Sequence, residues 1–298
     1  MRRSIALAGV LTAALAAVLA PALAAAQESV TFHAAVPQAG ESIAYATGGV
    51  MQFKTAASAG GREIRSQSID VKSAENYQLD ILDANADAPR RGRVRYFQSE
   101  STSSADQAAA KREVGPVAGK TYLLAVNDAS NAGSAGLQVT DERGQPVSAE
   151  EDKEVRGDFP VFGHTDALCR YLDGKTVTTG KPLEDLDPAV AATLLGAKAG
   201  EDEMDQLSLE LHRIEHHAGL TYAVFQVRMS GVTDVAGTPM RIALAGYVTM
   251  TAEDCRLRSS HLEGRMAMQD QVKTQDGGQL DMRMTGSARI LMHLGYAQ

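Results

Sequence analysis

The stretch from Leu262 to Leu294, LEGRMAMQDQVKTQDGGQLDMRMTGSARILMHL, decides the fold. In its first part apolar side chains alternate with polar ones, and the alternation returns after the polar, glycine-containing segment TQDGG. Alternation with a period of two is typical of a strand that has one buried face and one solvated face. Two such segments joined by a turn with glycine form a β-hairpin. The stretch therefore predicts two long antiparallel strands.

The segments upstream extend this pattern into a larger sheet. LTYAVFQVRM (220–229) and MRIALAGYVTM (240–250) alternate in the same way, so the C-terminal part is expected to be a long antiparallel meander, shaped as a curved sheet or half-barrel. Residues 27–150 form a β-rich N-terminal region, with strand patterns such as GGVMQFKT (48–55) and NYQLDILD (76–83). The predicted fold is therefore mainly β.

The middle of the chain predicts two short helices within the C-terminal region, residues 151–298. SAEEDKEVRGD (148–158) is interpreted as a charged connector at the boundary between the two regions. DALCRYLD (166–173) and PAVAATLL (188–195) follow, and Asp187 is expected to cap the second helix. SESTSSADQAAA (99–110), upstream of the boundary, is expected to be a polar loop.

The first 26 residues have the pattern of a secretory signal peptide. Two arginines precede an apolar run from Ile5 to Leu19, and three alanines end at Ala26. The apolar run is too short to favour a permanent membrane span, so no transmembrane segment is expected in the mature protein. The sequence predicts an exported protein, periplasmic or extracellular.

The charge balance argues against a nucleic-acid partner. The chain has a formal net charge of −8, which gives no general attraction to polyanions. RRGRVRYF (90–97) interleaves basic and aromatic residues, but its alternation is typical of a strand with a solvated arginine face.

The chain has 2 cysteines, Cys169 and Cys255. In an oxidising compartment two cysteines commonly pair, so a disulfide between them is predicted. The alternative is two separate buried thiols that behave as small apolar groups.

The segment HRIEH, His212 to His216, matches the H-x-x-E-H pattern of a zinc-peptidase class. On a helix its two outer histidines lie about 6 Å apart along the axis and could bind one ion, whereas on a strand they lie ~13 Å apart. Leucines alternate at 207, 209 and 211, which favours the strand, although a helical stripe is also present. A metal-dependent hydrolase using His212, Glu215 and His216 is therefore an alternative hypothesis. Other catalytic motifs are absent from the sequence, so neither enzymatic activity nor a cofactor is expected.

Most of the 11 methionines fall on the predicted apolar face of the C-terminal sheet. Methionine is deformable and is used heavily on surfaces that accept varied apolar partners. This face is therefore a candidate site for a lipid or another apolar ligand. The alternative is that it packs against the two short helices or the N-terminal strands. The candidate residues are Met240, Met250, Met266, Met268, Met282 and Met284, with Met292 on the same face.

Three segments of the C-terminal part carry a resemblance to known proteins: AGLTYAVFQV (218–227), GYVTMTAEDCRL (246–257) and HLEGRMAM (261–268). Together they resemble a group of exported, β-rich bacterial envelope proteins that have no assigned function. The resemblance implies an envelope or extracellular location and a strand at 207–214, and it carries no functional residues across. The leading hypothesis is a non-enzymatic binding or assembly module of the cell envelope. The expected partner is a lipid or an envelope protein, and the oligomeric state stays open.

Overall fold

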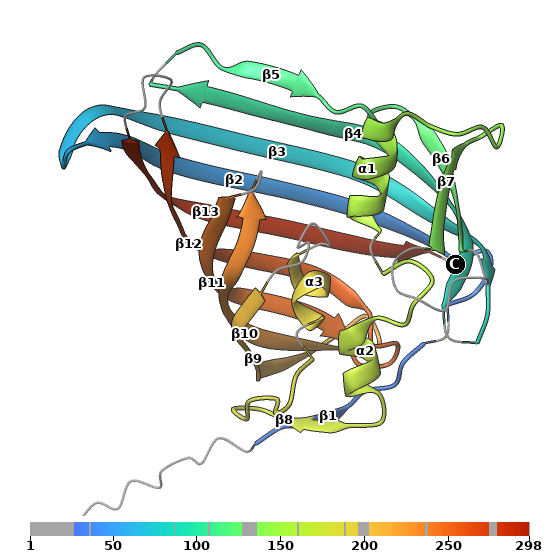
Figure 1. Ribbon diagram of the computed structural model, residues 1–298. Coiled ribbons are helices and arrows are strands. Elements are labelled where there is room, and N and C mark those ends of the chain that lie inside the picture. The colour runs from blue at the N-terminus through green and yellow to red at the C-terminus, as the bar shows by residue number, and fades with distance from the viewer. Residues whose placement is uncertain are drawn as a thin grey trace, which may run out of the picture.

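The computed structural model describes residues 27–297, apart from 36, 87, 107, 127–135, 160, 188, 196–202, 236–237 and 274–278. The predicted signal peptide, residues 1–26, lies outside the described residues. An 11-stranded antiparallel sheet dominates the molecule (Figure 1). The prediction of a mainly β protein is therefore confirmed.

The large sheet contains two blocks of strands that follow each other along the chain. The N-terminal block comprises β2 (Ser42–Ala59), β3 (Arg62–Ala84), β4 (Pro89–Ala105), β5 (Lys111–Val114), β6 (Thr121–Val126) and β7 (Leu137–Asp141). The C-terminal block comprises β9 (Glu203–His217), β10 (Leu220–Val235), β11 (Thr238–Thr251), β12 (Leu257–Lys273) and β13 (Gln279–Ala297). A separate two-stranded sheet pairs β1 (Ser29–Thr31) with β8 (Thr176–Thr178).

The strand order is β7-β6-β4-β3-β2-β13-β12-β11-β10-β9, with β5 paired to β4. The predicted hairpin is present as β12 and β13, and the C-terminal meander is formed as expected. The last strand, β13, also pairs along its length with β2. The regions 27–150 and 151–298 therefore contribute to one continuous sheet.

One strand of the N-terminal block, β4, runs further than the sequence indicated. The predicted loop at 99–110 is wrong for its first part, because β4 continues to Ala105. Its serines and threonines pair with β3 on one side and, from Glu100 to Ser103, with β5 on the other. These ladders satisfy the backbone groups of a segment whose small polar side chains favour turns.

The described part of the chain contains three helices, α1 (Ala149–Asp158), α2 (Ala167–Leu172) and α3 (Val190–Leu195). The two predicted helices are confirmed as α2 and α3, and the Asp187 carboxylate accepts a hydrogen bond from the Ala189 N–H at 2.9 Å. The interpretation of 148–158 as a connector is wrong, because these residues form α1. A capping box explains this: Ser148 Oγ accepts from the Glu151 N–H, and the Glu151 carboxylate accepts from the Ser148 N–H.

The sheet is strongly curved, and all three helices lie on its concave side (Figure 1). Glycines contribute to the curvature where β11 meets β12. A Cβ atom on Gly264 would lie 1.9 Å from the carbonyl oxygen of Ala243, and one on Gly246 would lie 1.9 Å from that of His261. Only glycine allows the neighbouring backbones to approach so closely. None of the described helices is long and apolar enough to span a bilayer.

The described residues bury two apolar clusters, one for each block of strands. In the C-terminal cluster, α2, α3, β1 and β8 pack on β9 to β13 with side chains such as Phe32, Leu168, Leu172 and Leu194. In the N-terminal cluster, tyrosines of β2, β3, β4 and β6 meet Val155, Phe159 and Phe162. Each cluster thus has its own helical cover on the same concave face.

Candidate functional site

The predicted methionine face is real, but its residues fall into two groups. Four methionines lie in the C-terminal cluster and are almost fully buried. Their exposed fractions are 7% for Met240, 0% for Met250, 6% for Met266 and 4% for Met292. Above this cluster lie Leu168 and Leu172 of α2 and Val190 and Leu194 of α3, all with no exposed area. This part of the face is an ordinary protein core, as the alternative interpretation anticipated.

The other group lies nearer the end of the sheet where β2 turns into β3. Met268 and Met284 are only half-buried, and they lie side by side because Met268 pairs with both Met240 and Met284. Met282 is also half-buried and belongs to the next row along the strands. No described helix lies over this end of the concave face, at the left in Figure 1.

Sequence reasoning missed two members of this second group, Met51 and Phe53 of β2. Both are half-buried, and the pairing of β2 with β13 places Phe53 opposite Gly286 and Met51 opposite Ala288. Their alternation was visible in GGVMQFKT, but the sequence gives no sign that this segment pairs with the C-terminal strand. The half-buried set is called the methionine strip, and it consists of Met51, Phe53, Met268, Met282 and Met284.

The two cysteines are brought together, but the predicted disulfide is not formed in the structure. Cys169 on α2 and Cys255 in the turn between β11 and β12 are both free thiols. Each sulfur lies within hydrogen-bonding distance of the backbone carbonyl of the other cysteine. The side-chain hydrogen bond with Cys255, together with burial, holds the pKa of the Cys169 thiol well above its ordinary value. The pair fastens α2 to the sheet.

The HRIEH segment lies in β9, so the strand interpretation is confirmed. His212 sits at a bulge and its ring lies 5.4 Å from that of Tyr247, whereas His216 lies against Thr221, 3.4 Å from Nδ1 to Oγ1. Residues four apart on a strand lie ~13 Å apart, too far to bind the same ion. Among the described residues no group of three or more metal-ligating side chains could hold a metal ion. The geometric basis of the hydrolase hypothesis is therefore removed.

A network of largely buried charges joins the two blocks at the opposite end of β2 and β13 from the methionine strip. Arg256 donates to the Glu41 carboxylate at 2.5 Å, and Arg258 donates to the Asp254 carboxylate at 2.8 Å. Both guanidinium groups lie over the ring of Tyr296, at 4.8 and 4.3 Å from its centroid. Because each cation faces a carboxylate, we assign this network a structural role, which is to tie the segment before β2 to the turn after β11.

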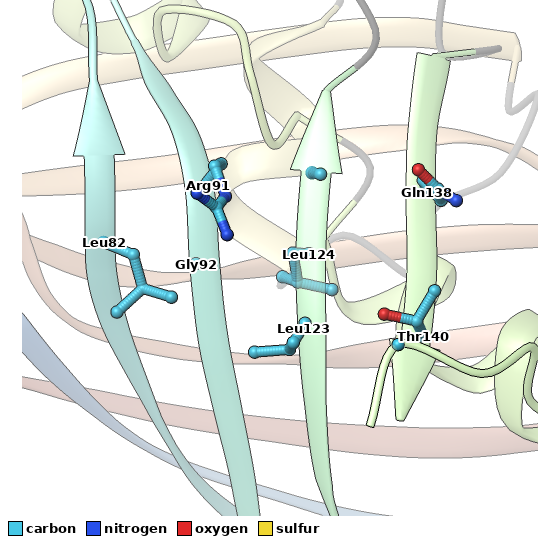
Figure 2. Close-up of a pocket in the computed structure, with 9 residues that line it drawn as sticks. Leu82, Arg91, Gly92, Leu123, Leu124, Gln138 and Thr140 are labelled. Carbon is cyan, nitrogen blue, oxygen red and sulfur yellow. The ribbon is translucent and has the colours of Figure 1, made fainter. Parts of the chain in front are cut away.

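A shallow pocket of about 220 Å³ opens on the outer face of β3, β4, β6 and β7, away from the helices (Figure 2). Its polar groups are the Arg91 guanidinium, the Gln138 amide and the Thr140 hydroxyl. Leu82 and Leu123 supply the apolar part of its wall. Its lining residues include no carboxylate, imidazole or thiol, so the pocket offers no acid–base pair or activated nucleophile. Arg91 belongs to the solvated arginine face predicted for 90–97.

No protein-family model and no curated protein matches this chain. Two solved structures are similar to it at low levels. One is described as "Lipid-protein interactions in lipovitellin", with 7% identity and a TM-score of 0.39, covering 87% of this chain and 26% of that chain. The other is the outer membrane protein OprG from Pseudomonas aeruginosa, with 8% identity and a TM-score of 0.16, covering 90% of this chain and 100% of that chain. At these levels neither likeness bears on function.

Proposed function

We propose that this protein is a non-enzymatic, exported binding module of the cell envelope that holds a lipid or another apolar chain on the methionine strip. The observation that carries the proposal is the half-buried state of the strip beside a fully packed core. Met268 and Met284 stay partly exposed, although they lie in the same row as the buried Met240 and next to the row of the buried Met266.

The side chains of the strip suit an apolar ligand of variable shape. Methionine has three rotatable bonds and a polarizable sulfur, so neighbouring methionines adapt to chains of different length and curvature. Met51, Phe53, Met268, Met282 and Met284 come from three adjacent strands, β2, β13 and β12. Contiguous apolar surface of this kind marks interaction sites more often than it marks plain solvent-exposed sheet.

The open part of the strip can hold part of an acyl chain. From Met282 to Gly286 along β13 the face extends ~14 Å, at ~3.4 Å per residue of antiparallel strand. The ring of Phe53 lies close to Gly286, and the next residue on this face, Ala288, is only 5% exposed. An apolar chain lying along β13 would therefore touch methionines at the open end and Phe53 further in.

The experiment measures displacement of a fluorescent fatty-acid analogue by hexadecanoate in three forms of the protein. Met284→Lys places a charge in the strip and is expected to weaken binding at least about tenfold, because burying an unpaired ammonium against an acyl chain is costly. Thr285→Lys is the matched control, because the adjacent residue is exposed and faces the opposite side of β13. It is expected to bind like the wild-type protein.

Met284→Gln, which removes the apolar end without adding a charge, covers the case in which Met284→Lys does not fold. Circular dichroism confirms the fold of each form. Equal binding by the lysine variants, or no binding by the wild-type protein, would contradict the proposed function.

A further inference from the structure

We infer that the ligand of the methionine strip is an anionic amphiphile, whose carboxylate or phosphate group is held by Arg62 and Arg65 at the open end of the strip. This inference rests on the proposed function and adds the chemical class and the direction of the ligand. It follows from where charged residues lie along the concave face.

Arg65 lies next to the apolar end of the strip. In the sheet Arg65 pairs with Ala57, and Ala57 pairs with Met282. Residues directly opposite each other in antiparallel strands project from the same face, so the Arg65 side chain starts from the concave face, in the row of Met282. The β2–β3 hairpin that carries it forms the far end of the sheet, at the left of Figure 1 in blue.

Arg62 adds a second cation at the same place. It pairs with Ala59 at the end of the hairpin, just beyond the row of Arg65. Both arginines are exposed, and neither forms an ion pair or a hydrogen bond with the described part of the chain. An arginine without a partner has its full set of N–H donors available for a carboxylate or phosphate.

The inner end of the concave face has the opposite charge. Under α1, the Glu154 carboxylate accepts from Ser99 Oγ at 2.9 Å, and the Asp158 carboxylate accepts from the Tyr96 hydroxyl at 2.8 Å. Glu75 lies in the same row as Ser99 and is 7% exposed. An anionic head group would be repelled here, whereas an apolar tail carries no charge and would not be repelled. The charges therefore direct the head group to the arginines.

The carboxylates of Glu63 and Asp270 lie near the open end. Glu63 pairs with Ser58, so it starts from the face opposite to Arg65. Asp270 lies on the concave face. Asp270 on β12 pairs with Met282, on the side of Met282 that is away from β2. Its carboxylate accepts a hydrogen bond from the Gln271 N–H at 2.7 Å. Negative charge therefore lies on the β12 side of the open end, and the two arginines lie on the β3 side. The head group is therefore expected on the β2–β3 side.

The test compares hexadecanoate with hexadecan-1-ol, which has the same chain and no charge. The wild-type protein is expected to bind the carboxylate about tenfold more tightly than the alcohol, the size of effect that a charge-assisted hydrogen bond gives. The double variant Arg62→Glu/Arg65→Glu is expected to lose this preference while its affinity for the alcohol stays unchanged. Arg283→Glu, an exposed arginine on the opposite face of β13, is the matched control and is expected to keep the preference.

The outcomes separate the two proposals. Binding of both ligands with equal affinity by the wild-type protein, or a preference that survives in the double variant, overturns the assignment of the arginines and leaves the apolar site standing. Binding of neither ligand by the wild-type protein overturns the proposed function, and this inference with it. Tight binding of acetate, which has no chain, would show a simple anion site and would likewise overturn the inference.

Discussion

Two parts of one apolar face differ in how deeply their side chains are buried. Met250 lies beneath the helical cover of the C-terminal cluster and has no exposed area, whereas Met284 lies on the same concave face and is only half-buried. Residue type and strand periodicity are the same in both places. What differs is the cover, because α2 and α3 are short and end before the methionine strip begins (Figure 1). The same alternating pattern therefore provides a core at one end and an exposed apolar surface at the other.

The largest expected effect is on the free energy of unfolding, when a methionine beneath α2 and α3 is truncated. Met250→Ala is expected to lower the free energy of unfolding by about 2–5 kcal/mol, because it removes a fully buried side chain and leaves a cavity. Met284→Ala is expected to lower it by about 1 kcal/mol or less, because that side chain already contacts solvent. Urea unfolding followed by circular dichroism measures both values. Equal losses for the two variants would mean that the strip is packed like the core.

A smaller effect on stability is expected at α1, the helix that covers the N-terminal cluster and is held to the sheet by polar contacts. Glu151 of α1 accepts from Lys120 Nζ at 2.8 Å and from the Tyr122 hydroxyl at 2.9 Å. The hydrogen bond with Lys120 and those with Ser148 lower the pKa of Glu151 from 4.5 to about 2. Because the folded pKa is depressed, its contribution to stability is present above about pH 4.5 and is lost as the pH falls towards about 2.

Glu151→Gln is therefore expected to be less stable than the wild-type protein at pH 7, with the difference shrinking to nothing near pH 2. Urea unfolding across this pH range measures the difference. Glu150→Gln, which changes an exposed residue in the first turn of the same helix, is the matched control. A pH-independent difference for Glu151→Gln would show that the contacts of α1 do not depend on this charge.

Local patterns in the sequence predicted much of this architecture. The alternation in β10 to β13 gave the meander, and Asp187 marked the start of one of the two helices that cover it. α1 was missed because its charged composition hid the capping box formed by Ser148 and Glu151. The Cys169–Cys255 pairing in space was predicted, and the bond was not found.

The candidate site was predicted only in part, for a physical reason. The methionines of β12 and β13 follow from periodicity, but the other wall of the strip comes from β2. The pairing of β2 with β13 is a contact between distant segments, and no local pattern encodes it. Met51, Phe53, Arg62 and Arg65 could therefore be assigned to the site only once the sheet order was known. Which methionines the helices cover also depends on tertiary packing.

The most direct test of the account is photo-crosslinking with a hexadecanoic acid that carries a diazirine on its chain, followed by peptide mapping. The account predicts that the label falls on β2 between Met51 and Ala57 and on β13 between Met282 and Ala288. Unlabelled hexadecanoate is expected to compete for both positions. Labelling confined to the outer face, or the absence of any competed label, would contradict the claim that the methionine strip is a binding site.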